Sequence, residues 1–211
     1  MKGVLVCSVC CYQKNPPGVD IMLKSAASWG IQVELFKGRR WQNMYETKLV
    51  YLHECLESYK SRYDYVICHD AADVVWLSDL DDFEYPRKMT FAAERNCFPD
   101  ASLHDRYPMT ATSYRFLNAG GFCGPMDHVL ECFQKVRTIK DHKNDDQLAW
   151  SLGYLEGIGY EIDSDCEIFQ TLWGHGEHEF ECDHNVETDT CPFILHANGS
   201  MQGHPAYRRH T

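Results

Sequence analysis

The chain has 211 residues, of which 44% are hydrophobic and 24% are charged, and its formal net charge is -11. This size and composition fit one globular domain, and no apolar run approaches the roughly 20 residues of a membrane-spanning helix. The acidic balance disfavours general binding to nucleic-acid backbones and leaves that role to local basic stretches. We therefore expect a single domain over residues 1–211 with no membrane partner.

The cysteines indicate a reducing environment. Eleven of them are scattered from Cys7 to Cys191, and their odd number and irregular spacing favour reduced, mostly buried thiols over a disulfide framework. The N-terminal segment carries a lysine and a short apolar run but lacks the small-residue cleavage site of a signal peptide. These features predict a cytoplasmic protein.

The first third of the chain alternates strand-like and helix-like stretches. Buried apolar runs predict strands at residues 2–12, 31–36 and 63–70. Prolines at its entry and Gly30 at its exit predict a helix over residues 16–30, and apolar residues at helical intervals predict another over 43–63. This alternation predicts an α/β fold with a mainly parallel sheet flanked by helices, in which ligands bind beyond the carboxyl ends of the strands.

The rest of the chain continues the pattern. Further strands are predicted at residues 88–94, 115–125, 161–172 and 192–199. Helices are predicted over residues 126–140 and 144–155, the second from its capping residue and first-turn acids. Residues 174–190 show the weakest pattern and are predicted to form a loop.

The segment YDYVICHDAADVVW, residues 63–76, is apolar except for a few polar residues that include Asp70 and Asp73. A buried carboxylate needs a compensating partner, because an isolated charge away from water costs several kcal/mol or shifts its pKa. At a strand exit, the D-x-x-D spacing lets both carboxylates face one hard divalent ion such as Mg²⁺ or Mn²⁺. Taken alone, the pattern is more often two solvated or helix-capping acids.

Three other segments place polar residues or glycines at strand ends and helix starts. In RFLNAGGFCGP, Asn118 precedes Gly120 and Gly121 inside an apolar strand, which indicates either a bulge or the close approach of a ligand. In NDDQLAW, Asp145 and Asp146 begin a helix, where acids also simply complement the helix dipole. The last strand, FILHANG, ends with His196, Asn198 and Gly199. We expect all of these at one edge of the sheet.

The order of the motifs resembles the glycosyltransferase domain of the multifunctional procollagen lysyl hydroxylases. The matching pieces are VICHDAADVVW, FAAERNCFPD, YRFLNAGGFCGP, NDDQLAW, IFQTL and PFILHANG. The resemblance implies a GT-A-like, Rossmann-type fold and a transferase that moves a hexose, glucose or galactose, from a UDP-sugar to a hydroxyl acceptor. It also implies Mn²⁺, or Mg²⁺, as the cofactor.

The resemblance implies roles residue by residue. The metal ligands would be Asp70, Asp73 and His196. The residues at the reacting centre would be Asn118, Asp145 and Asp146. The donor would be bound by Trp41, Lys48, Glu94, Gly120, Gly121, Asn198 and Gly199. Chemically, a divalent ion neutralises the departing diphosphate, and a carboxylate deprotonates the attacking hydroxyl or stabilises the oxocarbenium-like state. Retention and inversion both stay open.

Two segments depart from the family pattern. Ala71 and Ala72 stand between the aspartates, where the family usually has a tyrosine able to stack on uracil. Phe98 stands where a tryptophan usually follows the glutamate motif. Both departures leave the base and the sugar open.

The acceptor is also open: a hydroxylated protein side chain, a small saccharide or a hydroxymethylated base in phage DNA. In the last case, basic residues would contact phosphates, unless they only form a solvated helix face and tail. They are Lys135, Arg137, Lys140, Lys143, Arg208 and Arg209. We expect an intracellular enzyme of microbial or viral type.

Two rival interpretations belong to other classes of protein. One is a non-catalytic domain that binds a sugar nucleotide. The other is a zinc protein, with ligands of the right type but no standard spacing at His175, His178, Cys182 and His184.

Overall fold

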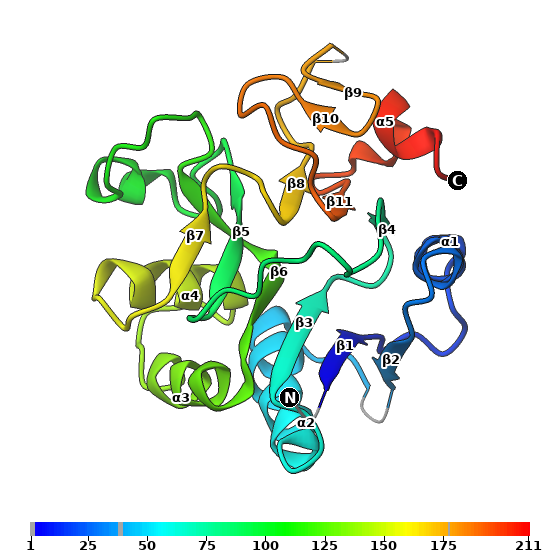
Figure 1. Cartoon of the computed structure of the whole chain (residues 1–211). Helices are drawn as coiled ribbons and strands as arrows, with labels where there is room; N and C mark the ends of the chain where they lie inside the picture. The colour runs from blue at the N-terminus through cyan, green and yellow to red at the C-terminus, as the bar shows by residue number, and fades with distance from the viewer. Residues whose placement is uncertain (1–2, 38–39, 177) are drawn as a thin grey trace.

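The computed structural model describes residues 3–37, 40–176 and 178–211. A six-stranded sheet forms its centre (Figure 1). Its strands are β1 (Val4–Val9), β2 (Val33–Phe36), β3 (Tyr65–His69), β5 (Thr90–Glu94), β6 (Phe116–Pro125) and β7 (Glu161–Asp163). They lie in the order β2-β1-β3-β6-β5-β7, and only β6 runs antiparallel to its neighbours. The predicted mainly parallel α/β sheet is confirmed, with one reversed strand.

Helices cover both faces of this sheet. The α-helices are α1 (Pro17–Ser28), α2 (Leu52–Tyr59), α3 (Met126–Val136), α4 (Asp146–Leu155) and the short α5 (Pro205–Arg208). Successive residues of β1 point to opposite sides, so Leu5 packs in one hydrophobic cluster with α2, α3 and α4, while Val6 packs in another with α1. No helix in the described part of the chain is both long and apolar enough to cross a membrane.

A smaller sheet lies against one end of the large one. It contains β4 (Val74–Trp76), β11 (Ile194–His196) and β8 (Phe169–Thr171), in the order β4-β11-β8. β11 is antiparallel to β4, with His196 opposite Val74, and parallel to β8. This sheet brings the end of the chain beside the loop that carries the D-x-x-D motif.

The prediction of a single strand over residues 161–172 is wrong. It divides into β7 and β8, which belong to different sheets. The cause is Asp163, whose carboxylate accepts hydrogen bonds from the backbone N–H groups of Glu167, Ile168 and Phe169 and so closes a turn between the strands.

Two other expectations need correction. The predicted loop over residues 174–190 contains two very short paired strands, β9 (Phe180–Glu181) and β10 (His184–Asn185). The helix predicted over residues 43–63 begins as a π-helix, η1 (Tyr45–Tyr51), before α2 continues it. The other predicted strands and helices are present, although Lys2, predicted in the first strand, lies outside the described residues. The sequence did not predict β4, α5 or the short 3-10 helices η2 (Ala101–Arg106) and η3 (Met201–Gly203). None of the eleven cysteines forms a disulfide, and only Cys182 and Cys191 are exposed.

Candidate active site

The loop between β3 and β4 is held at both ends. The backbone N–H of Asp70 donates to the carbonyl of Gly120 in β6, at 2.8 Å. The carbonyl of Asp73 accepts from the N–H of Ala197, directly after β11, also at 2.8 Å. The two aspartates are therefore fixed by the large sheet on one side and by the small sheet on the other.

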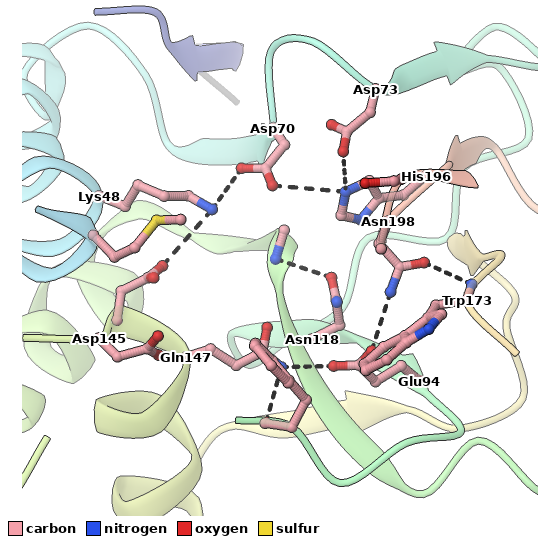
Figure 2. Close-up of a pocket in the computed structure, with 16 residues that line it drawn as sticks. Lys48, Asp70, Asp73, Glu94, Asn118, Asp145, Gln147, Trp173, His196 and Asn198 are labelled. Atoms are coloured by element: carbon pink, nitrogen blue, oxygen red, sulfur yellow. Dashed lines mark hydrogen bonds and ion pairs between the residues drawn. The ribbon is translucent and has the colours of Figure 1, made fainter. Parts of the chain in front are cut away.

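His196 faces both carboxylates, as Figure 2 shows. Its Nε2 lies 3.6 Å from Asp70 Oδ2 and 3.4 Å from Asp73 Oδ2. Burial alone would lower the pKa of His196, but the charge and hydrogen bond of Asp73 raise it overall. Burial likewise opposes ionisation of Asp73, but His196 lowers its pKa below the usual value.

These three side chains can hold a divalent cation. One ligand atom from each lies within 4.8 Å of the others. Two carboxylates and one imidazole suit Mn²⁺, and Mg²⁺ less closely, because phosphate oxygens and water can complete the shell. The other ring nitrogen, Nδ1 of His196, is buried without a hydrogen-bond partner among the described residues, so Nε2 is the nitrogen aimed at the site. The predicted metal ligands thus converge.

Lys48 lies beside the carboxylates because η1 presents it there. Its Nζ is 2.6 Å from Asp70 Oδ1 and 3.8 Å from Asp146 Oδ2. Burial would lower the pKa of Lys48, but the two carboxylates raise it, so the ammonium stays charged. Single turns of π-helix occur frequently at functional sites, and this one supplies a fixed positive charge.

The two aspartates at the start of α4 differ in task. Asp145 is the N-cap: its Oδ1 accepts the backbone N–H of Leu148 at 2.8 Å. Asp146 is 4% exposed, and burial raises its pKa to about 6 against the lowering effect of Lys48. This raised pKa suits Asp146 to accept a proton.

A bulge in β6 forms the floor of the site. The pairing of β5 with β6 shifts so that residues 119–121 have no partners on β5. Side chains satisfy two of the freed donors: Gly120 N–H donates to Asn118 Oδ1 at 3.0 Å, and Ala119 N–H donates to Gln147 Oε1 at 3.1 Å. Asn118 thus supports the backbone beneath the site, and the bulge interpretation of the two glycines is confirmed.

The glycines are required by close packing. An ideal Cβ at Gly120 would lie 2.1 Å from His196 Cε1, and one at Gly121 would lie 2.8 Å from the ring of Phe169. Real Cβ atoms do not approach other atoms so closely, so His196 can occupy its place only above a glycine.

Glu94 is held by two amide groups. Gln147 Nε2 donates to Oε1 at 2.6 Å, and Asn198 Nδ2 donates to Oε2 at 3.0 Å. Glu94 is 1% exposed, and burial raises its pKa to about 7 in spite of these donors. The network fixes one carboxylate plane at the wall of the cavity, where it can accept hydrogen bonds from hydroxyl groups.

Most of the predicted site residues line one cavity of about 410 Å³. The predicted residues in its wall are Lys48, Asp70, Asp73, Glu94, Asn118, Gly120, Asp145, Asp146, His196, Asn198 and Gly199. Gly121 is not in that wall. A second cavity of about 490 Å³ shares Asp70 and Asp73 with the first, and it contains the predicted Trp41.

The sequence predicted no role for several lining residues, and three of them are important to the site. Gln147 lies within NDDQLAW without a signal of its own, although it joins Glu94 to the bulge. Trp173 follows β8 and lines the first cavity, and Tyr12 follows β1 and lines the second. An aromatic residue just after a strand was the only available signal for the last two.

The structure does not assemble the proposed zinc site. His175 is buried with Nε2 2.8 Å from the hydroxyl of Tyr114, whereas His178 pairs with Glu181 and His184 with Asp189. Within residues 3–37, 40–176 and 178–211, Asp70, Asp73 and His196 form the only group of three or more His, Cys, Asp or Glu side chains whose ligand atoms all lie within 4.8 Å of one another.

Two of the basic residues considered for DNA binding lie far apart. α3, which contains Lys135, and α5, which contains Arg208, are on opposite sides of the molecule in Figure 1. Three of the basic residues pair with acids: Lys135 with Glu131, Lys143 with Asp100, and Arg209 with Asp183.

Comparisons with known proteins show what the whole chain is similar to. A family model described as "PLOD GT domain" matches residues 2–206. A multifunctional procollagen lysine hydroxylase and glycosyltransferase of Caenorhabditis elegans is 32% identical over 92% of this chain and 30% of its own length. An uncharacterized protein of Acanthamoeba polyphaga mimivirus is 34% identical over 68% of this chain and 33% of its own length. The chain thus spans about a third of the length of these curated relatives.

A solved structure supports the fold. A glycosyltransferase involved in glycosylation of the major capsid of PBCV-1 superposes with a TM-score of 0.58 and 12% sequence identity, covering 98% of both chains.

Proposed function

The chain belongs to the family of PLOD GT domains and is a glycosyltransferase, and we propose that it moves a hexose from a UDP-sugar to a hydroxyl acceptor. The transfer would use a divalent cation, Mn²⁺ or Mg²⁺. The observation that carries the proposal is the convergence of Asp70, Asp73 and His196 beside the ammonium of Lys48. Such a set of charges is suited to binding a diphosphate through a cation.

The two adjoining cavities suggest how the donor lies. They meet at Asp70 and Asp73, so a diphosphate held there would direct the nucleoside into one cavity and the sugar into the other. The second cavity has the aromatic residues Tyr12 and Trp41, which suit a base. Tyr12 can supply the stacking surface that the alanines of the D-A-A-D segment lack.

The residues of the first cavity suit the sugar and its transfer. When bound, the cation would neutralise the charge of the leaving diphosphate. Lys48 adds a fixed positive charge beside it, at low cost because two carboxylates already hold the ammonium. Glu94 can accept hydrogen bonds from sugar hydroxyls, and Asp146 can accept the proton of the attacking hydroxyl or stabilise positive charge on the sugar ring.

We further propose that the protein works in a reducing compartment such as the cytoplasm, which suits cysteines that are mostly buried or half-buried.

The decisive experiment measures release of UDP from UDP-glucose and UDP-galactose, with and without Mn²⁺. We expect release that depends on the cation and is lost in Asp73→Asn, whose fold should persist because the side chain serves the cation rather than the core. Full activity in EDTA, or in Asp73→Asn, would refute the metal-dependent mechanism.

A further inference from the structure

One wall of the first cavity is aromatic. Trp173, after β8, and Phe98, after β5, both line it, and their ring centroids lie 5.6 Å apart at an interplanar angle of 83°. Phe98 is 49% exposed, although a large apolar side chain gains free energy by burial. The pair therefore presents apolar surface in a cavity that otherwise contains several carboxylates.

The backbone of Trp173 is fixed by two side-chain amides. Its N–H donates to Asn198 Oδ1 at 2.9 Å, and its carbonyl accepts from Asn96 Nδ2 at 3.3 Å. These bonds place the indole at the same wall as Glu94, as Figure 2 shows.

Gly199 supports the ring from one side. Its φ is +62°, and an ideal Cβ there would lie 2.7, 2.9 and 3.0 Å from the indole atoms Cγ, Cδ1 and Cδ2. Similar distances to three atoms of one ring mean that the glycine backbone covers a face of the indole. Contact with the cavity is thus left to the remaining surface of the ring.

The surroundings of the indole suit a carbohydrate. Asn198, which holds Trp173 in place, also donates to Glu94, so a fixed aromatic ring stands beside a fixed carboxylate. A pyranose has an apolar face of C–H groups that packs on an aromatic ring, while its hydroxyls donate to a carboxylate. A flexible, acyclic alcohol offers no comparable face.

The position favours the acceptor over the donor. The diphosphate of the proposed donor belongs at Asp70 and Asp73, whereas Trp173 pairs with Phe98, which is half exposed to solvent. Resting on the proposed function, we propose that Trp173, with Phe98, forms an aromatic platform that stacks on the ring of a saccharide acceptor.

The test compares three readouts in Trp173→Ala and Trp173→Phe. They are transfer to methyl β-galactoside and methyl β-glucoside, transfer to free 5-hydroxylysine as a non-sugar hydroxyl, and release of UDP without acceptor. We expect the KM for a methyl glycoside to rise at least about tenfold in Trp173→Ala and to recover partly in Trp173→Phe. UDP release without acceptor and transfer to 5-hydroxylysine should stay within about twofold.

A control and a binding measurement complete the design. Trp29→Ala removes another partly exposed tryptophan, 43% exposed and outside both cavities, and should leave all three readouts unchanged. Methyl glycosides should also change the tryptophan fluorescence of the wild type but not of Trp173→Ala, a readout that needs no turnover.

Three results would overturn the platform: equal losses with sugar and non-sugar acceptors, a rise in the KM of the UDP-sugar alone, or no use of either glycoside by a wild type that releases UDP. Failure of the wild type to release UDP from any UDP-sugar would instead overturn the proposed function itself.

Discussion

The imidazole of His196 lies directly above the Cα atom of Gly120, so close that a methyl group at Gly120 would come within 2.1 Å of Cε1 and 2.7 Å of Nδ1. The two residues belong to strands of different sheets, β11 and β6. The bulge in β6 therefore sets the position of His196, the third candidate metal ligand, although β6 and β11 are not paired in one sheet.

Replacement of Gly120 by alanine should displace His196. We expect the affinity for Mn²⁺ in the presence of UDP to fall about 10- to 100-fold, the range found when groups that orient metal ligands are changed. Calorimetric titration with Mn²⁺ measures this. Gly176→Ala is the matched control, because its Cβ would meet only the carboxylate of Glu179, at an ordinary 3.5 Å. Unaltered Mn²⁺ affinity in Gly120→Ala would contradict the packing argument.

Removal of the cation should lower stability in a way that depends on Asp73. At a concentration 100 times its dissociation constant, a ligand of the folded state adds about 2.7 kcal/mol to the free energy of unfolding. Wild type with Mn²⁺ and UDP should therefore melt at a higher temperature than in EDTA, whereas Asp73→Asn should show no such difference. Asp105→Asn, at a side chain 98% exposed, should behave as wild type. A cation-induced shift that survives in Asp73→Asn would rule out this site.

The rate should depend on pH through Asp146. Burial raises the pKa of Asp146 to about 6, so the carboxylate that accepts a proton is present above that pH and is lost as the pH falls through it. We expect kcat/KM to decline below about pH 6, and Asp146→Asn to lower kcat by about 10²- to 10⁴-fold and abolish this decline.

Glu94 provides the control for this profile. Burial raises the pKa of Glu94 to about 7, so its ionisation gives the rate a second dependence on pH, separate from that of Asp146. Glu94→Gln should retain the decline near pH 6. A profile of the Asp146→Asn variant that keeps the wild-type shape would assign the acidic limb to another group.

Tyr12 should contribute to binding of the base. Tyr12→Ala removes an aromatic ring from the second cavity, and we expect the KM of the UDP-sugar to rise about tenfold with a smaller change in kcat. Tyr12→Phe keeps the ring and should stay close to wild type. Steady-state kinetics with varied donor separate the two constants, and an unchanged KM in Tyr12→Ala would show that the base lies elsewhere.

The large sheet could be predicted well because the sequence signals for its strands and helices are local. Each strand of the βαβαβ opening is a continuous apolar run, and each helix has its own periodicity and end signals, as the residues from Val4 to His69 show. The carboxylates Asp70 and Asp73 stood out for the same reason, as charges inside an apolar segment.

The small sheet could not be predicted in this way. β4, β8 and β11 have three residues each, too few for a periodic pattern, and their pairing depends on contacts between distant parts of the chain. The place of His196 came from the resemblance to a family, and Gln147 and Trp173 were missed because their tasks arise only from tertiary contacts.

The register of β4 with β11 has a consequence for biosynthesis. Val74 lies opposite His196, so the cation site is complete only when β11, which ends at His196, has left the ribosome and paired with β4, which is made much earlier. A nascent polypeptide stalled before that point would display both aspartates with no imidazole between them. Affinity for the cation thus develops only after β11 has been synthesised, and it reports that this strand has docked.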